Sequence, residues 1–276
     1  MSAIAVVAVP PYVPPSVHFR RRMAGFAAIV AFLVGSGVFL GFKPWLLITD
    51  FNYIVKLAGE MVPPNLAMLW EKTSLRASVA ETVAMAFLGT LVGGCAALGL
   101  AFFAAANTAP HPAVRTAVRA LFQFERATPN LITALVLLVA VGFGPFAGLL
   151  ALTFGSLGMF GKLFADAIEQ VDAGPTEAVI SVGASRWQVI RFAILPQVLP
   201  SVVGNAFYAF DVNLRLAIAL GIYGAGGLGF ELQLAMKVLR YPDVLALVLL
   251  IVVLITAMER VSDFVRRRLI GADTLK

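Results

Sequence analysis

The sequence predicts an all-α, polytopic membrane protein with about six transmembrane helices. Composition is the first observation behind this prediction: the 276 residues are 60% hydrophobic and 13% charged, with a mean hydropathy of +0.91. A soluble domain is only about 45–50% apolar. Several apolar runs also approach the roughly 20 residues that one span needs. Finally, basic residues gather in segments that a single topology places on one side of the membrane.

The first span is expected at residues 23–42, directly after Arg20-Arg21-Arg22. These arginines orient the start of the span toward the cytoplasm, so residues 1–22 are expected to be a cytoplasmic tail. Residues 43–76 mix charged and apolar positions and are expected outside, as an interfacial helix and loop. Trp45, Tyr53 and Trp70 would then lie at headgroup depth, and residues 23–78 form the first region of the chain.

Residues 79–265 form the expected core of the protein, followed by a cytoplasmic tail at 266–276. Its apolar runs predict five further spans, at about residues 79–106, 129–141, 146–164, 201–223 and 244–258. The second span carries small residues at every fourth position, namely Gly89, Gly93, Ala97, Ala101 and Ala105. This spacing gives one helix face a close approach to another helix, inside the subunit or in a second copy.

The basic residues test this topology. Residues 111–126 are expected to be a basic, polar cytoplasmic segment, with Arg115, Arg119 and Arg126. With both termini inside, the cytoplasmic segments hold about twice as many Lys and Arg residues as the external ones, as the positive-inside rule requires. The net charge of +6 therefore reflects basic cytoplasmic loops, and no nucleic-acid partner is expected. Cys95 is the single cysteine, so the chain forms no internal disulfide.

Residues 174–200 are a polar, proline-bounded interruption that this topology places in the cytoplasm. Pro175 suits the first turn of a helix, and Glu177 lies in that turn, where the helix dipole favours a negative charge. Gly183 can end this helix, and Ser185 can cap a second one. Leu195-Pro196 is expected to stop the second helix, because proline disfavours helical geometry in the residue before it.

Two short helices with apolar faces, carrying Arg186 and Arg191, would therefore lie at the membrane surface and need a partner to cover them. Glu177-Ala178, Gly183 six positions after the glutamate, and Leu195-Pro196 resemble the EAA loop of ABC-importer permeases. In that family the loop docks into a cleft of a cytoplasmic ATPase. Val179 and Ala193 depart from the general pattern, which has alanine and isoleucine there. The resemblance implies an ATPase-coupling role for Glu177, Ala178, Gly183, Ala184, Arg186, Leu195 and Pro196. The residues by themselves leave an ordinary amphipathic connector as the alternative.

The fifth span is unusually polar, with Asn205, Asp211, Asn213 and Arg215 inside it. A charge at the centre of a membrane helix costs about 2.5–3.5 kcal/mol, so such side chains face a bundle interior or a wet cavity. Asp211 and Arg215 are four residues apart and can pair on one helix face. Two hypotheses stay open: a self-neutralised structural pair, or a helix lining a substrate path with Arg215 as donor to an oxyanion.

Glycines follow the fifth span and spell G-x-G-x-x-G at Gly224, Gly226 and Gly229, with Gly227 between them. A dinucleotide-binding fingerprint needs a strand before it and an acidic residue about 20 positions after it. Here a membrane span precedes the glycines, which favours a turn at the end of a span, and part of an outer gate. The chain has no G-x-x-x-x-G-K-[ST] phosphate loop, so another chain must hydrolyse any nucleotide.

From about residue 81 to residue 269 the chain is similar to the phosphonate-type ABC permeases, most clearly at residues 142–148, 161–178, 183–200 and 213–232. The resemblance implies a type I importer permease fold with a cytoplasmic coupling helix, in the plasma membrane of a prokaryote, with both termini cytoplasmic. It implies a homodimer that works with two ATP-binding subunits, which use ATP and Mg, and with an extracytoplasmic solute-binding protein. The chain itself would be no enzyme and bind no cofactor. The implied substrates are phosphonates, phosphite or phosphate, moved by alternating access.

Three alternatives remain at this point. An importer permease for another small solute fits the same loop. A secondary transporter would need no ATPase, which leaves the EAA-like loop unexplained. An intramembrane enzyme would need a nucleophile or a metal cluster in the spans, and His18 and His111, the two histidines, lie far apart in polar segments.

Overall fold

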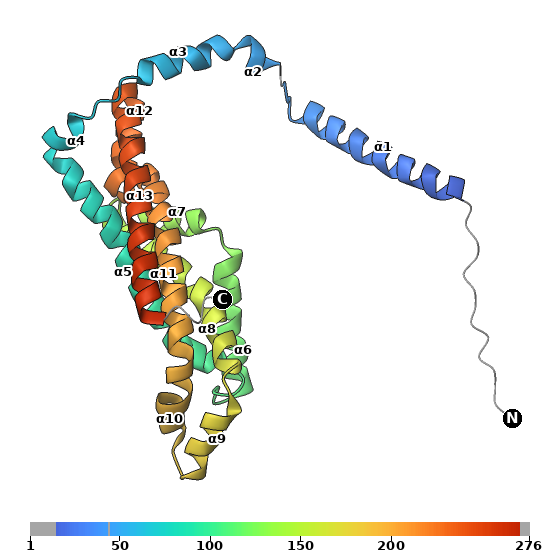
Figure 1. Ribbon diagram of the computed structural model, residues 1–276, viewed down its shortest axis with the longest axis vertical. Coiled ribbons are helices and arrows are strands. Elements are labelled where there is room, and N and C mark those ends of the chain that lie inside the picture. The colour runs from blue at the N-terminus through green and yellow to red at the C-terminus, as the bar shows by residue number, and fades with distance from the viewer. Residues whose placement is uncertain (1–14, 44, 271–276) are drawn as a thin grey trace. The chain divides into compact units, whose positions relative to one another are not determined.

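The computed structural model describes residues 15–43 and 45–270, and every regular element within these residues is a helix (Figure 1). The chain divides into two compact units, with the boundary between Ala58 and Gly59. The first unit contains α1 (Pro15–Phe39), α2 (Leu46–Thr49) and most of α3 (Phe51–Met61). Within α1, residues Arg22–Phe39 are long and apolar enough to cross a membrane, which confirms a first span in this region.

The helix α1 differs from the expectation at its beginning. It starts at Pro15, so the described part of the expected cytoplasmic tail belongs to the helix, while residues 1–14 lie outside the described residues. Proline is well suited to the first turn of a helix, because its missing N–H would have no partner there. The helix α3 is amphipathic, with Phe51, Ile54 and Val55 on one side and Lys56 and Glu60 on the other, as expected of a helix at a membrane interface.

The second unit is a helical bundle built around α5 (Thr73–Ala104) and α8 (Pro145–Glu169), preceded by the short α4 (Met68–Glu71). The small residues of α5 face α8. A Cβ added at Gly89 would lie 2.7 Å from the Leu152 Cβ, and one at Gly93 would lie 2.6 Å from the Ser156 Cβ. The small-residue face therefore packs inside the subunit, which is the first of the two arrangements expected from its spacing.

Along the chain, α5 is followed by α6 (Pro112–Ala127) and α7 (Asn130–Val141) before α8 begins. The helices α6 and α7 meet at an angle of 92°. Residues 111–126 were expected to be a polar segment, but most of them form α6, whose first turn is capped by the Nδ1 of His111, 3.1 Å from the Ala113 N–H. The 12 residues of α7 reach only about 18 Å, short of the roughly 30 Å hydrocarbon core. The described chain thus has five helices able to span, or six if the bent pair counts as one.

The chain continues through α9 (Ala173–Ser181), α10 (Arg186–Val189) and a π-helical turn η1 (Ile190–Ile194) into α11 (Leu195–Leu220). The predicted stop at Leu195-Pro196 is wrong, because α10, η1 and α11 form one continuous helical run. A π-turn leaves carbonyls without their usual donors, so a proline that lacks an N–H fits directly after it. The Gln197 side chain donates to the Ala193 carbonyl at 2.9 Å within this turn.

A second π-turn, η2 (Gly221–Ala225), leads into α12 (Gly227–Lys237), and α13 (Tyr241–Ile270) completes the bundle. The helix α13 extends past the expected span of 244–258 into the expected tail, whose residues 271–276 lie outside the described residues. Figure 1 shows α9 and α10 at one end of the bundle and α12 at the other.

Three clusters of buried apolar side chains hold the second unit together. The one nearest α9 and α10 includes Phe160, Phe164, Ile168 and Val198. A middle cluster includes Met85, Leu138, Leu152 and Leu214, and a third joins the start of α5 to α12 and α13 through Leu75, Leu228 and Leu247. Both ends of α11 are therefore anchored, which fixes the positions of its polar side chains.

Candidate functional site

The expected coupling segment forms two short helices, as the sequence predicts, at the end of the bundle farthest from α12 (Figure 1). The first helix starts two residues before Pro175, because Asp172 is its cap and accepts a hydrogen bond from the Gly174 N–H at 3.1 Å. Gly183 has φ +82°, a conformation that residues with a side chain rarely adopt, and it ends this helix. Ser185 caps α10, and its N–H donates to the Gln188 side chain at 2.7 Å.

One face of this segment is fixed to the bundle. Val179 and Ala184 pack against the core, and Val189 is buried. The Gln197 side chain, at the start of α11, accepts a hydrogen bond from the Asp172 N–H at 3.0 Å. Val179 and Ala193, the two departures from the general EAA pattern, both point their small apolar side chains toward this core. The segment is therefore a rigid extension of α8 and α11.

The opposite face is open. Val182 is 81% exposed and Trp187 is 74% exposed, next to the exposed Glu177, Ala178 and Arg186. Of the other two expected coupling residues, Leu195 is half-buried and Pro196 is exposed, where α11 begins. A tryptophan and a valine so exposed beside a carboxylate and a guanidinium are typical of a surface that another protein covers. We call the exposed face of α9 and α10 the docking face.

The polar residues of the fifth span do not converge on one site. Asn213 is buried, and its amide nitrogen donates to the Thr90 Oγ1 at 2.8 Å and to the Ser156 Oγ at 2.7 Å. This triad ties α11 to α5 and α8. The Asn205 amide nitrogen donates to the Ser201 Oγ of the same helix at 3.3 Å.

Asp211 and Arg215 lie on the opposite face of α11, as their spacing predicts, but the structure does not pair them with each other. The helix α13 packs across this face and gives each a separate partner. Asp211 accepts a hydrogen bond from the Ser262 Oγ at 3.1 Å, and the Arg215 guanidinium pairs with the Glu259 carboxylate. The structural interpretation of the two charges is thus supported, with a different partner for Arg215 than the sequence suggests.

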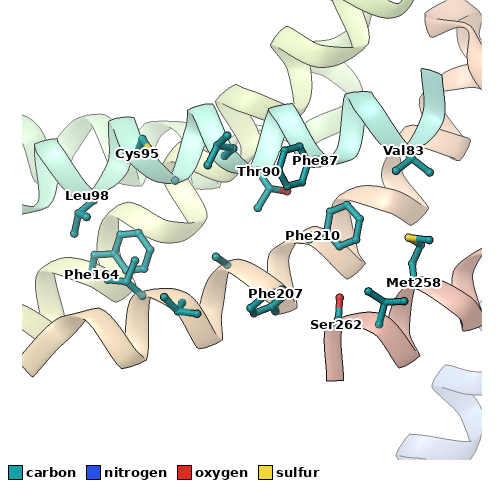
Figure 2. Close-up of a pocket in the computed structure, with 16 residues that line it drawn as sticks. Val83, Phe87, Thr90, Cys95, Leu98, Phe164, Phe207, Phe210, Met258 and Ser262 are labelled. Atoms are coloured by element: carbon teal, nitrogen blue, oxygen red, sulfur yellow. The ribbon is translucent and has the colours of Figure 1, made fainter. Parts of the chain in front are cut away.

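A large cavity of about 510 Å³ lies between α5, α11 and α13, and Figure 2 shows its lining. Its walls are apolar, and the Phe87 and Phe210 rings meet edge to face across it with centroids 6.4 Å apart. Its Thr90 hydroxyl already donates to the Ala86 carbonyl at 2.7 Å. An oxyanion would find almost no donors here, so this cavity does not suit the expected substrates.

The glycine-rich turn at the α12 end of α11 begins inside the π-turn η2, where Gly224 has a non-helical backbone; a helix precedes it, which agrees with the rejection of a dinucleotide site. Gly224, Gly226 and Gly227 all have positive φ, at 107°, 83° and 67°. The α5 side chains cap the helix that follows: Glu81 accepts from the Gly227 N–H at 3.1 Å, and Thr82 accepts from the Leu228 N–H at 2.9 Å. The expected gate residues therefore sit in a turn with a defined conformation.

Two ion-pair networks were missed by the sequence reasoning. At the end of the bundle that carries α12, the buried Glu231 pairs with Lys72 at 2.5 Å. At the end near α9, the Arg119 guanidinium reaches Glu169 at 2.7 Å and the Ala104 carbonyl at 2.8 Å. The only signal for them in the sequence was an acidic residue directly after an apolar segment, which does not identify a partner more than 40 positions away.

Comparison with known proteins gives a consistent picture. Residues 97–271 match the family described as "Binding-protein-dependent transport system inner membrane component". The chain is 44% identical over 231 residues to the phosphate-import permease protein PhnE of Mycolicibacterium smegmatis, covering 84% of this chain and 43% of that protein. It is 39% identical over 221 residues to the phosphite transport system permease protein PtxC of Stutzerimonas stutzeri, covering 80% of this chain and 79% of that one.

The match thus spans less than half of the mycobacterial protein but most of the other relative. Among solved structures, the inward-facing MetNI methionine ABC transporter aligns with a TM-score of 0.62 and 24% identity, over 73% of this chain and 97% of that chain. This similarity concerns the fold alone.

Proposed function

This protein belongs to the family of inner-membrane components of binding-protein-dependent transport systems, as a phosphonate-type ABC-importer permease, and we propose that it carries oxyanions of phosphorus. It is a multi-pass membrane protein and a permease subunit rather than an enzyme, because ATP hydrolysis in this family is performed by a separate subunit. The proposed substrates are phosphate, phosphite and phosphonates. The names of its relatives support the first two, and the resemblance of residues 142–232 supports all three.

The observation that carries the proposed coupling to an ATPase is the docking face of α9 and α10. Its inner side is fixed to the core through Val179 and Val189, while its outer side exposes Val182 and Trp187. This surface is rigid, exposed and partly apolar, and it lies at the start of the continuous helical run Arg186–Ala225. A partner bound there could displace it, and the displacement would be transmitted to α11.

We infer that two ATP-binding subunits cover this face in two copies of the chain, and that ATP with Mg is used only there. A solute-binding protein would dock at the opposite end, near the glycine turn of Gly224–Gly229. Both termini would be cytoplasmic, which places the docking face on the side of the ATPase. The positive-inside distribution of Arg and Lys supports this orientation.

The test is the ATPase activity of the complex reconstituted in proteoliposomes with its binding protein. Phosphate, phosphite and methylphosphonate should each be compared with methionine and sulfate for stimulation of ATP hydrolysis and for uptake. Stimulation by at least one phosphorus oxyanion, with none by methionine, is the expected result. Stimulation by methionine or sulfate alone would contradict the proposed substrate class but leave the docking role intact.

The docking role has its own test. Glu177→Lys reverses the charge on the docking face, so substrate-stimulated ATP hydrolysis should fall at least about tenfold, since like charges across an interface cost several kcal/mol. The control is Gln170→Lys, which also introduces a lysine, at the exposed end of α8 outside the docking face. Equal loss in both variants, or normal coupling in Glu177→Lys, would reject the docking role.

A further inference from the structure

A polar cleft runs along the face of α11 that carries Asn213, opposite to Asp211 and Arg215. Its middle part is a cavity of about 270 Å³ between α8, α11 and the bend that joins α6 to α7, and its polar lining consists of Glu125, Arg126, Asn130 and Asn213. A cavity of about 240 Å³ shares Asn130, Gly155, Asn213 and Leu216 with it and reaches Tyr223 in the outer π-turn. A third, of about 110 Å³, shares Arg126 and reaches Lys162 and Asp166. These three cavities adjoin one another and together form the polar cleft.

The cleft connects two regions that a transport path must connect. Its outer end lies at η2, next to the glycine turn, and its inner end lies at Lys162 and Arg119, close to the helix end that carries the coupling segment. The apolar cavity of Figure 2 lies on the other side of α11 and offers no such line of polar groups. A polar groove on one helix face, with the rest of the bundle packed behind it, is typical of a solute path.

Arg126 is the cationic side chain in this cleft that is available to bind an anion. It lies in the last turn of α6 and lines both the middle and the inner cavity. Among the described residues Arg119 and Arg215 are engaged by Glu169 and Glu259, whereas Arg126 has no ion-pair partner. A guanidinium without a carboxylate partner keeps its planar fork of donors available for an oxyanion.

The acidic groups in the cleft do not cancel this charge. The Glu125 side chain is pressed against α8, since a Cβ added at Gly158 would overlap its carboxylate. Asp166 lies in the inner cavity, where Arg119 and Lys162 accompany it. Because Arg119 is already paired with Glu169, Lys162 is the cation left beside Asp166, and among the described residues no carboxylate lies within ion-pair distance of Arg126.

Two amides complete the middle of the cleft. Asn130, at the start of α7, lies against Gly155, where an added Cβ would be 3.3 Å from its Oδ1, so the glycine makes room for this side chain. Asn213 uses its two amide hydrogens on Thr90 and Ser156, which leaves its oxygen as the group that can accept a hydrogen bond. A partly protonated phosphorus oxyanion has both acceptor oxygens for Arg126 and an O–H for such an amide oxygen.

We propose that Arg126, together with Asn130 and Asn213, contacts a tetrahedral oxyanion of phosphorus as it passes along the polar cleft, and that Arg215 has no such contact. This inference rests on the proposed function for the identity of the anion. It assigns the path to the face of α11 opposite to Asp211 and Arg215, and it places the cationic contact on α6 rather than on α11.

The first test measures the cleft without relying on transport. Because Cys95 is the only cysteine, Cys95→Ala gives a background in which Asn130→Cys is the single thiol of the permease in the assembled, reconstituted complex. Methanethiosulfonate reagents of opposite charge should react at different rates, with the anionic sulfonatoethyl reagent favoured over the cationic trimethylammonioethyl reagent. Adding Arg126→Gln should lower this rate ratio about threefold or more, since one nearby charge is removed. Millimolar inorganic phosphate should slow the modification when Arg126 is present.

Arg260→Gln is the matched control, because Arg260 is an exposed arginine of α13 that lines none of the three cavities. It removes the same charge and should leave the rate ratio unchanged. An equal change in both variants, or no change with Arg126→Gln, would overturn the proposal. If Arg126→Gln does not assemble, Arg126→Lys serves in its place: it keeps the charge and should keep the rate ratio, but it lacks the planar fork, so phosphate should protect less than it does with Arg126. Undiminished protection would overturn the contact.

The second test is uptake, with cysteine restored to position 95. Arg126→Gln should reduce uptake of phosphate, phosphite or methylphosphonate about tenfold, as expected for loss of a charge-assisted hydrogen bond, and Arg126→Lys should retain part of it. Normal uptake by Arg126→Gln would overturn the contact. If the unaltered complex carries none of these anions, the proposed function fails, while the thiol rate ratio still decides whether the cleft is an anion path.

Discussion

At the scale of single residues, glycines allow the close approach of α12 to the end of α11. The turn that starts in η2 brings α12 back against α11, and Gly221 and Gly229 leave room for this contact. A Cβ at Gly229 would lie 1.9 Å from the Ile218 carbonyl oxygen, and one at Gly221 would lie 2.5 Å from the Gly226 carbonyl oxygen. Both contacts are with backbone atoms, which cannot rotate away as a side chain can.

Gly229→Ala should therefore displace α12 and lower the free energy of unfolding by more than the roughly 1–3 kcal/mol that is usual for an overpacked core. Gly99→Ala is the matched control, since Gly99 lies inside α5, in its C-terminal part, with open space around its Cβ position. The control should be neutral or stabilising by up to about 1 kcal/mol, because alanine favours helices. Thermal unfolding of the detergent-solubilised protein measures both. Equal unfolding temperatures for the two variants would contradict the packing described here.

Some residues were predictable because their role is local. Gly183 needs a positive φ and Ser185 needs a free N–H group to cap, and both conditions follow from the neighbouring sequence. The partner of Arg215 was not predictable in this way. Helix spacing pointed to Asp211, but Glu259 lies 44 positions away and meets Arg215 only through the packing of α13 on α11. Arg126 was similarly counted among loop cations, because nothing in the sequence marks the bend that turns it into the polar cleft.

At the scale of elements, α11 is organised by its two faces. One packs on α13 through Arg215 with Glu259 and Asp211 with Ser262, and the other holds Asn213 against α5 and α8. The first face is therefore structural, and the charges on it should matter for assembly before they matter for transport.

Glu259→Arg places two guanidinium groups side by side and should weaken the packing of α13 on α11 by about 1 kcal/mol, since both side chains are partly exposed. This should be seen as a lower yield of assembled permease and a lower unfolding temperature. The double variant Arg215→Glu with Glu259→Arg restores opposite charges and should recover most of this loss, as a double-mutant cycle would measure. Recovery of stability and of uptake together indicates a structural pair. Recovered stability with uptake still abolished would instead place Arg215 on the transport path.

Element boundaries were harder to predict than the elements themselves. Residues 111–126 read as a basic loop, yet alternating apolar and basic positions make α6 an amphipathic helix whose Phe122 is buried against α8. The expected stop before Pro196 rested on the rule that proline disfavours helical geometry in the residue before it. This rule describes regular α-helices, but a π-turn directly precedes Leu195-Pro196 and accommodates the missing N–H of the proline. In both places the outcome depends on tertiary contacts, which a local rule does not contain.

At the scale of the whole second unit, polar contacts join the helices at both ends of the bundle, and between these ends the polar cleft and the apolar cavity lie on opposite sides of α11. At the end that carries α12, the Lys72–Glu231 ion pair and the Glu81 cap join α5 to α12. At the opposite end, just before α9 begins, Arg119 and Glu169 join α5, α6 and α8. The polar cleft runs between these two sets of contacts. Both α8 and α11 line the cleft, so a movement of α9 and α10 would displace the end of α8 and α11 and would change the cleft.

This arrangement requires one topology, with the docking face in the cytoplasm. In the Cys95→Ala background, a cysteine at Val182 tests the docking face and a cysteine at Val238 tests the opposite end; both positions are exposed in this chain. A membrane-impermeant maleimide should label Val182→Cys only in inside-out vesicles and Val238→Cys only in right-side-out vesicles, because the basic residues of the cytoplasmic segments fix the orientation. Added ATPase subunit should protect Val182→Cys and leave Val238→Cys reactive. Labelling of Val182→Cys from outside would remove the docking face from the reach of any cytoplasmic ATPase, and with it the reason that α9 and α10 project from the bundle.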